Sequence, residues 1–124
     1  MMTAAEYIES LRKLKTVVYL FGERVENFVD HPIIRPSVNS VAMTYALAGN
    51  PEYSGLMTAV SGLTGKKINR FCHIHQSTED LVKKVKMQRL VGQKTGSCFQ
   101  RCVGMDAFNA IFSKIGRASC RERV

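Results

Sequence analysis

The stretch of sequence that decides the fold is Cys98-Phe99-Gln100-Arg101-Cys102-Val103-Gly104-Met105-Asp106-Ala107-Phe108-Asn109-Ala110-Ile111-Phe112. At helical spacing its apolar side chains cover the whole circumference, and only Arg101 and Asp106 are charged. A helix of this kind belongs in the interior of a protein larger than this chain. We therefore predict a mainly α fold that leaves apolar surface of this helix exposed when the chain stands alone.

Two cysteines in this stretch predict a metal or cluster site. Cys98 and Cys102 are four residues apart, so on a helix both sulfurs project from one face and can reach the same ion or iron-sulfur cluster. Two thiolates do not complete such a site, because a structural zinc or an iron-sulfur cluster usually takes four protein ligands. The alternative is plain packing, since a free cysteine behaves as a small hydrophobic residue.

A second helix is predicted directly upstream. Ser77 suits its N-cap and Asp80 its third position. Because two opposite apolar faces cannot pack on one partner, this helix must change partners along its length or break near Gly92 or Gly96. The two faces are formed by Leu81, Val82 and Val85 and by Met87, Leu90 and Val91.

The N-terminal part of the chain predicts a short helix and a small β-hairpin. Thr3 and Glu6 form a capping box ahead of an apolar helical pattern, so this helix should run to about Lys13. Residues 17–25 then read as a hairpin, with Gly22 at the turn position that needs a positive φ.

Two further helices are predicted in the middle of the chain. Pro32 and Pro36 punctuate an extended segment, after which apolar residues recur at helical spacing up to Gly49. Asn50 and Pro51 suit the N-cap and the first position of the next helix, which should run through about Val60.

The segment from Ser61 to Gln76 reads as a loop with weak structure, and it contains a second group of candidate ligands. Cys72, His73 and His75 could in principle join Cys98 and Cys102 around zinc, which would make the chain a small helical zinc or binding module. Their spacing matches no common zinc module, and isolated histidines are more often hydrogen-bonded core or surface residues. The zinc module is therefore the weaker alternative.

Length and composition limit the number of domains in the chain. A chain of 124 residues that is 45% hydrophobic is enough for one small domain. The codons that would encode Lys114 to Val124 read like a common sequencing-library adapter, so we expect residues 115–124 to be a non-native tail and residues 1–114 to be a truncated N-terminal helical domain. Cys120 lies in that tail and supports no chemical argument.

Charge and hydropathy indicate which kinds of partner the chain could bind. The net charge is +8, and a cluster of basic residues occupies one region: Lys83, Lys84, Lys86, Arg89 and Lys94. These residues spread around the helix without interleaved aromatic side chains, which favours a solvated face over nucleic-acid binding. No apolar run approaches the roughly 18 residues of a membrane span. We expect a cytoplasmic protein with reduced thiols and no membrane or nucleic-acid partner.

Several strings resemble one enzyme family. They are Arg35-Pro36-Ser37-Val38-Asn39-Ser40-Val41-Ala42-Met43-Thr44-Tyr45, His75-Gln76-Ser77-Thr78, Lys86-Met87-Gln88-Arg89-Leu90, Gly92-Gln93-Lys94-Thr95 and residues 98–109. From Thr3 to Phe112 the chain resembles the N-terminal part of the 4-hydroxybutyryl-CoA dehydratase/vinylacetyl-CoA delta-isomerases, a group related to the flavin-dependent 4-hydroxyphenylacetate 3-hydroxylases. The hydroxylases share the Arg-Pro-Ser and Asp-Ala-Phe-Asn-like regions but lack the cysteine pair. Cys98 and Cys102 thus favour the dehydratase branch over the alternative, a hydroxylase fragment.

The resemblance implies both a fold and a function. The fold is the N-terminal helical domain of an acyl-CoA dehydrogenase-like protein. The activity is the dehydration of 4-hydroxybutyryl-CoA to crotonyl-CoA, and isomerisation of vinylacetyl-CoA, by a radical mechanism that uses FAD and a [4Fe-4S] cluster. Three cysteines and one histidine hold the family's cluster, and Cys98 and Cys102 match the first two cysteines. The other ligands, the flavin contacts and the catalytic residues are expected beyond Ser113, in a homo-oligomer expected to be a tetramer, so the fragment alone should be inactive.

Overall fold

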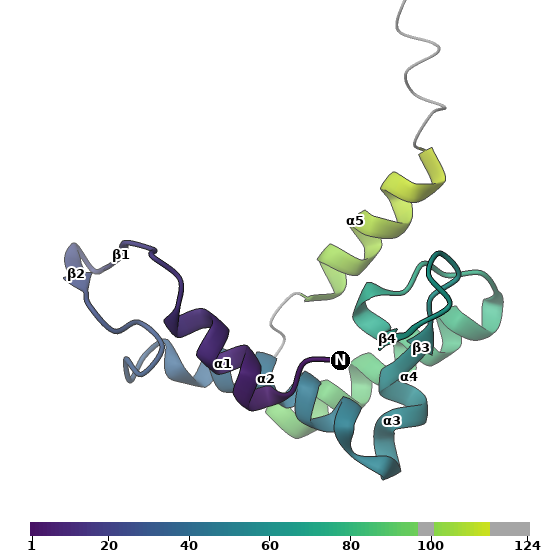
Figure 1. Ribbon diagram of the computed structural model, residues 1–124, viewed down its shortest axis with the longest axis horizontal. Coiled ribbons are helices and arrows are strands. Elements are labelled where there is room, and N and C mark those ends of the chain that lie inside the picture. The colour runs from purple at the N-terminus through teal and green to yellow at the C-terminus, as the bar shows by residue number, and fades with distance from the viewer. Residues whose placement is uncertain (97–100, 115–124) are drawn as a thin grey trace, which may run out of the picture.

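Helices make up most of the structure, and two short antiparallel hairpins connect them (Figure 1). This computed structural model describes residues 1–96 and 101–114. The helices are α1 (Ala4–Arg12), α2 (Arg35–Gly49), α3 (Pro51–Met57), α4 (Thr78–Thr95) and α5 (Arg101–Lys114). The strands are β1 (Val18–Leu20), β2 (Glu23–Val25), β3 (Thr58–Val60) and β4 (Lys67–Asn69), and a 3-10 turn, η1, spans Arg70–Cys72. The predicted mainly α fold is confirmed for the part of the chain that the structure describes.

The N-terminal helix and hairpin form as predicted. Thr3 and Glu6 make the reciprocal capping box at the start of α1, and the helix ends with Lys13 at its C-cap. Strands β1 and β2 pair with Val18 opposite Val25. Phe21 and Gly22 form the two-residue turn, and both have positive φ, as a tight turn between twisted strands requires.

Helix α2 begins earlier than the sequence predicts. The extended segment expected at residues 31–36 is instead a turn, in which Arg35 N–H donates to the carbonyl oxygen of His31 at 2.8 Å, and α2 starts at Arg35. Pro36 is tolerated in the first turn because backbone N–H groups there have no partner within the helix. Tyr7 of α1 stacks on Tyr45 of α2 with ring centroids 4.9 Å apart, which joins the two helices.

The predictions of a helix to Val60 and of a loop from Ser61 to Gln76 are wrong. Asn50 does cap α3, but the helix stops at Met57, and Thr58 Oγ1 donates to the carbonyl oxygen of Ser54 at 2.6 Å. Thr58–Val60 then pairs with Lys67–Asn69 as a second hairpin, which leads directly into η1. Strands of three residues are too short to show an alternating pattern, so the sequence carried little signal for them.

The core lies between the C-terminal part of α2, α3, η1, α4 and α5. Its buried members are Leu47, Ala48, Met57, Phe71, Met87, Val91 and Met105. The two predicted faces of α4 are confirmed: Met87 and Val91 are buried, whereas Leu81, Val82 and Val85 are each nearly half exposed. The predicted break is also confirmed, since α4 ends at Thr95 and Gly96 forms a left-handed C-cap with φ of 64°.

Helix α5 contacts η1, and it is also joined to α4 through the Lys84–Asp106 pair (Figure 1). Met105 is its buried apolar contribution to the core. Four of its large apolar side chains are exposed, as predicted for an apolar helix in a short chain: Val103, Phe108, Ile111 and Phe112. Residues 115–124, where a non-native tail is expected, lie outside the described residues. Within the described part, no helix is long and apolar enough to cross a membrane.

Candidate functional site

The predicted ligand pair brackets the start of α5. Cys102 is the second residue of α5, and its side chain is not among those described; Cys98 falls within residues 97–100, outside the described part of the chain. The structure describes helix α4, which ends before Cys98, and helix α5, which contains position 102. Gly96 ends α4 by donating its N–H to the carbonyl oxygen of Gly92 at 2.9 Å, and α5 continues from Arg101. The site can therefore be built from the contacts that hold α5.

A single asparagine joins α5 to the segment that follows η1. Asn109 Oδ1 accepts a hydrogen bond from the backbone N–H of His75 at 2.7 Å. Asn109 Nδ2 donates to the carbonyl oxygen of His73 at 3.3 Å and to that of Met105, one turn earlier in α5, at 2.9 Å. The amide thus binds both sides of the contact between α5 and residues 73–75.

An ion pair joins α5 to α4 as well. The ammonium group of Lys84 contacts Asp106 Oδ1, and the Lys84 side chain is 15% exposed. Met105 lies next to Asp106 and is buried in the core. Among the described residues, Met105, the Lys84–Asp106 ion pair and the Asn109 amide hold α5, and they lie within a little more than one turn.

Beneath this contact lies a buried cation. Arg70 of η1 donates through Nε to the carbonyl oxygen of Leu56 at 2.7 Å and through Nη2 to that of Thr58 at 2.6 Å. Its Nη1 lies 3.4 Å from Asp80 Oδ1 in the first turn of α4. One guanidinium therefore ties the end of α3, the start of β3 and the start of α4 together, as the forked geometry of arginine allows.

Asp80 connects this cation to the histidine segment. Burial opposes its ionisation, but the hydrogen bonds from the backbone N–H of Gln76, from His73 and from Ser77, with the charge of His73, lower the pKa of Asp80 to about 2. His73 Nε2 lies 3.3 Å from Asp80 Oδ1. The carboxylate is thus ionised at neutral pH and holds the residues on both sides of the α4 N-terminus.

The two histidines each keep one ring nitrogen without a partner. His73 Nδ1 and His75 Nε2 are buried and have no hydrogen-bond partner among the described residues. Burial, followed by the nearby positive charge of Lys84, lowers the pKa of His75. His75 is therefore neutral at physiological pH and fits a partly buried site without a counter-ion.

The candidate zinc ligands are not gathered into a metal site in the part of the chain that is described. Cys72 is exposed, and His73 is engaged by Asp80. Among the described residues, no group of three or more His, Cys, Asp or Glu side chains could hold a metal ion. The His73–His75 segment binds α5 through the Asn109 amide.

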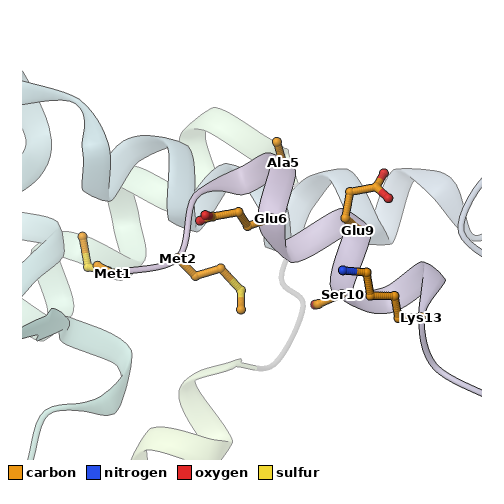
Figure 2. A pocket seen from close by; sticks show the side chains of 7 residues that line it. All are labelled: Met1, Met2, Ala5, Glu6, Glu9, Ser10 and Lys13. Atoms are coloured by element: carbon orange, nitrogen blue, oxygen red, sulfur yellow. The ribbon is translucent and has the colours of Figure 1, made fainter.

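A hollow of about 690 Å³ lies beside α1 and offers no chemistry of its own. Figure 2 shows Met1 and Met2 on the segment that leads into α1, Glu6 and Glu9 on α1 itself, and Lys13 at its C-terminal end. Glu6 is engaged in the capping box and Glu9 pairs with Arg12 at 3.2 Å. The carboxylates therefore serve local helix structure.

Sequence reasoning missed Arg70 and Asn109, the two side chains that organise this region. Asn109 carried a usable signal, because an asparagine within a largely apolar helix is costly unless its amide is satisfied. Arg70 carried none, since its role depends on a hairpin that the sequence did not predict.

Comparison with known proteins places the chain in a family. Residues 3–122 match the family model described as 4-hydroxyphenylacetate 3-hydroxylase N terminal. The 4-hydroxybutyryl-CoA dehydratase/vinylacetyl-CoA-Delta-isomerase of Clostridium aminobutyricum is 73% identical over 113 residues, which cover 91% of this chain and 23% of that protein. The oxygenase component of the 4-hydroxyphenylacetate 3-monooxygenase of Klebsiella oxytoca is 32% identical over 81 residues, or 64% of this chain and 15% of that protein.

Solved structures agree with the sequence matches. An oxygen-tolerant archaeal 4-hydroxybutyryl-CoA dehydratase from N. maritimus has a TM-score of 0.85 and 57% identity, covering 90% of this chain and 22% of that one. The oxygenase component of a 4-hydroxyphenylacetate 3-monooxygenase complexed with FAD has a TM-score of 0.64 and 30% identity, covering 76% and 19%. These neighbours have the acyl-CoA dehydrogenase-like fold that was expected. The chain spans less than a quarter of the length of these relatives, and it belongs to the 4-hydroxyphenylacetate 3-hydroxylase N-terminal family.

Proposed function

We propose that this chain is part of an enzyme that dehydrates 4-hydroxybutyryl-CoA to crotonyl-CoA and isomerises vinylacetyl-CoA. The observation that carries the proposal is the 73% identity to the dehydratase of C. aminobutyricum over 91% of the chain. Identity to the monooxygenase oxygenase component of K. oxytoca is 32% over a shorter stretch. A difference of this size favours the acyl-CoA substrate over a phenol.

Cys98 and Cys102 are suited to be two of the ligands of an iron-sulfur cluster. Thiolates are the ligands that iron-sulfur clusters require, and Cys98 and Cys102 have the spacing that lets two of them serve one cluster. We propose that they hold two positions of a [4Fe-4S] cluster, and that the other ligands and the flavin contacts belong to the longer protein. When bound, the cluster would supply a Lewis acid for the departing hydroxyl group and FAD would supply one-electron chemistry.

The contacts of α5 support this assignment. Asn109, Met105 and the Lys84–Asp106 pair hold helix α5, whose second residue is Cys102. A ligand segment needs such a fixed support, because metal ligands work only when they are held close to the required geometry. We also propose that the enzyme is a homo-oligomer, as the resemblance implies.

The competing function is hydroxylation of a phenol. It is favoured by the family description and by the relatives solved with FAD. An anaerobic assay of the full-length enzyme with 4-hydroxybutyryl-CoA separates the two, with a parallel assay of 4-hydroxyphenylacetate, reduced flavin and oxygen. We expect crotonyl-CoA from the first assay and no hydroxylated product from the second. Hydroxylation without crotonyl-CoA formation would overturn the proposal.

A further inference from the structure

We propose that Asn109 is a positioning residue that fixes α5, which carries the proposed ligand Cys102 as its second residue, against the segment formed by residues 73–75. The inference rests on the proposed function, since it needs the cysteines to bind a cluster. It assigns a role to Asn109, a residue for which the sequence alone indicated none. Asn109 does not touch the cluster in this account, and it acts only through the placement of the helix.

The amide of Asn109 is fully used. Its oxygen accepts from His75 N–H at 2.7 Å, and its nitrogen donates to the carbonyl oxygens of His73 and Met105 at 3.3 and 2.9 Å. This set needs one acceptor and two donors within a single short side chain, which only an amide supplies. The bond to Met105 fixes the amide on its own helix, and the bonds to residues 73 and 75 fix that helix to the neighbouring segment.

The segment that receives Asn109 is itself anchored. His73 is buried and lies 3.3 Å from Asp80, which also contacts the buried Arg70. Arg70 in turn holds the carbonyl oxygens of Leu56 and Thr58. Asn109 therefore connects α5 to a segment that is tied to the buried Arg70 through Asp80.

Within residues 1–96 and 101–114, the other contacts that hold α5 include the buried Met105 and the Lys84–Asp106 ion pair. Met105 is its buried core residue, while large apolar side chains on its other sides, Phe108 among them, are exposed. Positions 102, 105 and 109 follow the spacing of one helical face, and position 102 lies two turns, or roughly 10 Å, before position 109. A tilt of about 5° at Asn109 would move position 102 by about 1 Å, which is enough to loosen a metal site.

The test uses the full-length holoenzyme, prepared without oxygen, with Asn109→Ala as the principal variant. Asn39→Ala is the matched control, because Asn39 is an exposed helical asparagine in α2. The readouts are iron and acid-labile sulfide per protomer, the rate of iron release to a chelator, FAD per protomer and cooperative thermal unfolding. We expect Asn109→Ala to release iron about tenfold faster than wild type while keeping FAD and cooperative unfolding. Asn39→Ala should behave as wild type.

Two results would overturn the inference. Iron retention in Asn109→Ala equal to that of Asn39→Ala would show that the amide does not position the ligands. Loss of iron together with FAD and cooperative unfolding would show a general structural role instead. If Asn109→Ala does not fold, Asn109→Asp replaces it: this variant keeps the acceptor for His75 N–H but loses both donations, so we expect faster iron release, and release at the control rate overturns the inference.

The same experiment separates this inference from the proposed function. Cys98→Ser and Cys102→Ser are measured alongside. If both retain the full cluster, the ligand assignment fails whatever Asn109 does. If both lose the cluster but Asn109→Ala retains it, the proposed ligands stand and only the positioning role fails.

Discussion

Arg70 carries a positive charge on a side chain that is almost fully buried, with 3% of the residue exposed. A buried cation is tolerated only when its donors are satisfied, and here two carbonyl oxygens and Asp80 satisfy them. Its neighbours depend on it in return, because they would be left without a donor. Removal of Arg70 should therefore be far more costly than removal of an exposed arginine.

Replacement of Arg70 by methionine should lower the free energy of unfolding by about 3 kcal/mol, since it removes the guanidinium beside Asp80 and its donations to the buried carbonyl group of Thr58 and the partly buried one of Leu56. Arg24→Met is the matched control, because Arg24 forms an exposed pair with Glu26, and its cost should stay below about 0.5 kcal/mol. Urea titration of both variants measures the difference. Equal losses would contradict the central place given to Arg70.

The shifted pKa values of Asp80 and His75 make the stability of the fold depend on pH. The pKa of Asp80 is about 2 in the folded chain, below its ordinary 3.8, so its contribution is present above about pH 4 and is lost as the pH falls toward 2. The lowered pKa of His75 means that the unfolded chain takes up a proton more readily than the folded chain. The fold should therefore begin to lose stability already below the ordinary histidine value of 6.5.

His75→Gln should remove the loss of stability that begins below about pH 6.5, because the variant keeps the backbone N–H that binds Asn109 but has no group to protonate. Unfolding by urea at a series of pH values between neutral and mildly acidic tests this. His31→Gln controls for the loss of an imidazole elsewhere and should leave the acid effect in place. An unchanged acid profile in His75→Gln would show that another group titrates there.

At the scale of elements, the boundary between α4 and α5 depends on two glycines with opposite requirements. Gly96 has a φ of 64° at the C-cap of α4, whereas Gly92 lies within the helix and has open space around an added Cβ atom. An alanine at position 96 would be strained, and an alanine at position 92 would favour the helix.

Gly96→Ala should destabilise the chain by about 1 kcal/mol, and Gly92→Ala should stabilise it by a similar amount. The two variants make the same chemical change four residues apart, so each serves as the control for the other. Thermal unfolding followed by circular dichroism gives both signs. If Gly96→Ala stabilised the chain, α4 would continue past Thr95 and the placement of the cysteine segment after a helix break would be wrong.

The elements that the sequence predicted well share strong local signals. Thr3 with Glu6 and Ser77 with Asp80 are caps that act within one turn, and Gly22 and Gly96 mark positions of positive φ. The elements that it missed depend on partners elsewhere in the chain. Strands β3 and β4 have three residues each and exist because they pair with one another.

The candidate site divides in the same way. Helical spacing was enough to single out Cys98 and Cys102, whose side chains the structure does not describe. The support for α5 could not be found from spacing, because Asn109 binds residues 34 and 36 positions earlier in the chain. Contacts over such sequence separations follow from the tertiary fold.

At the scale of the whole molecule, two apolar surfaces are exposed to solvent. One lies on α4 and consists of Leu81, Val82 and Val85; the other lies on α5 and consists of Val103, Phe108, Ile111 and Phe112. The relatives are more than four times as long as the matched region, so the proposed full-length enzyme has ample chain to cover both. An exposed apolar surface of this kind promotes association when the chain stands alone.

The isolated chain should therefore bind a hydrophobic dye, and the pair Phe108→Ser with Ile111→Ser should reduce that binding because it removes two exposed side chains of α5. Leu63→Ser is the control, since Leu63 is an exposed side chain in the loop between β3 and β4. Fluorescence titration at equal protein concentration gives the comparison. Equal dye binding by the double variant and the control would show that α5 does not form the surface.

The central claim is that Cys98 and Cys102 are cluster ligands in the full-length protein. Its most direct test is elemental analysis of iron, zinc, acid-labile sulfide and FAD in full-length wild type, Cys98→Ser and Cys102→Ser, all prepared without oxygen. We expect iron and sulfide in the wild type, their loss in both serine variants, and FAD in all three. Full iron and sulfide occupancy in both serine variants, or zinc in place of iron in the wild type, would contradict it.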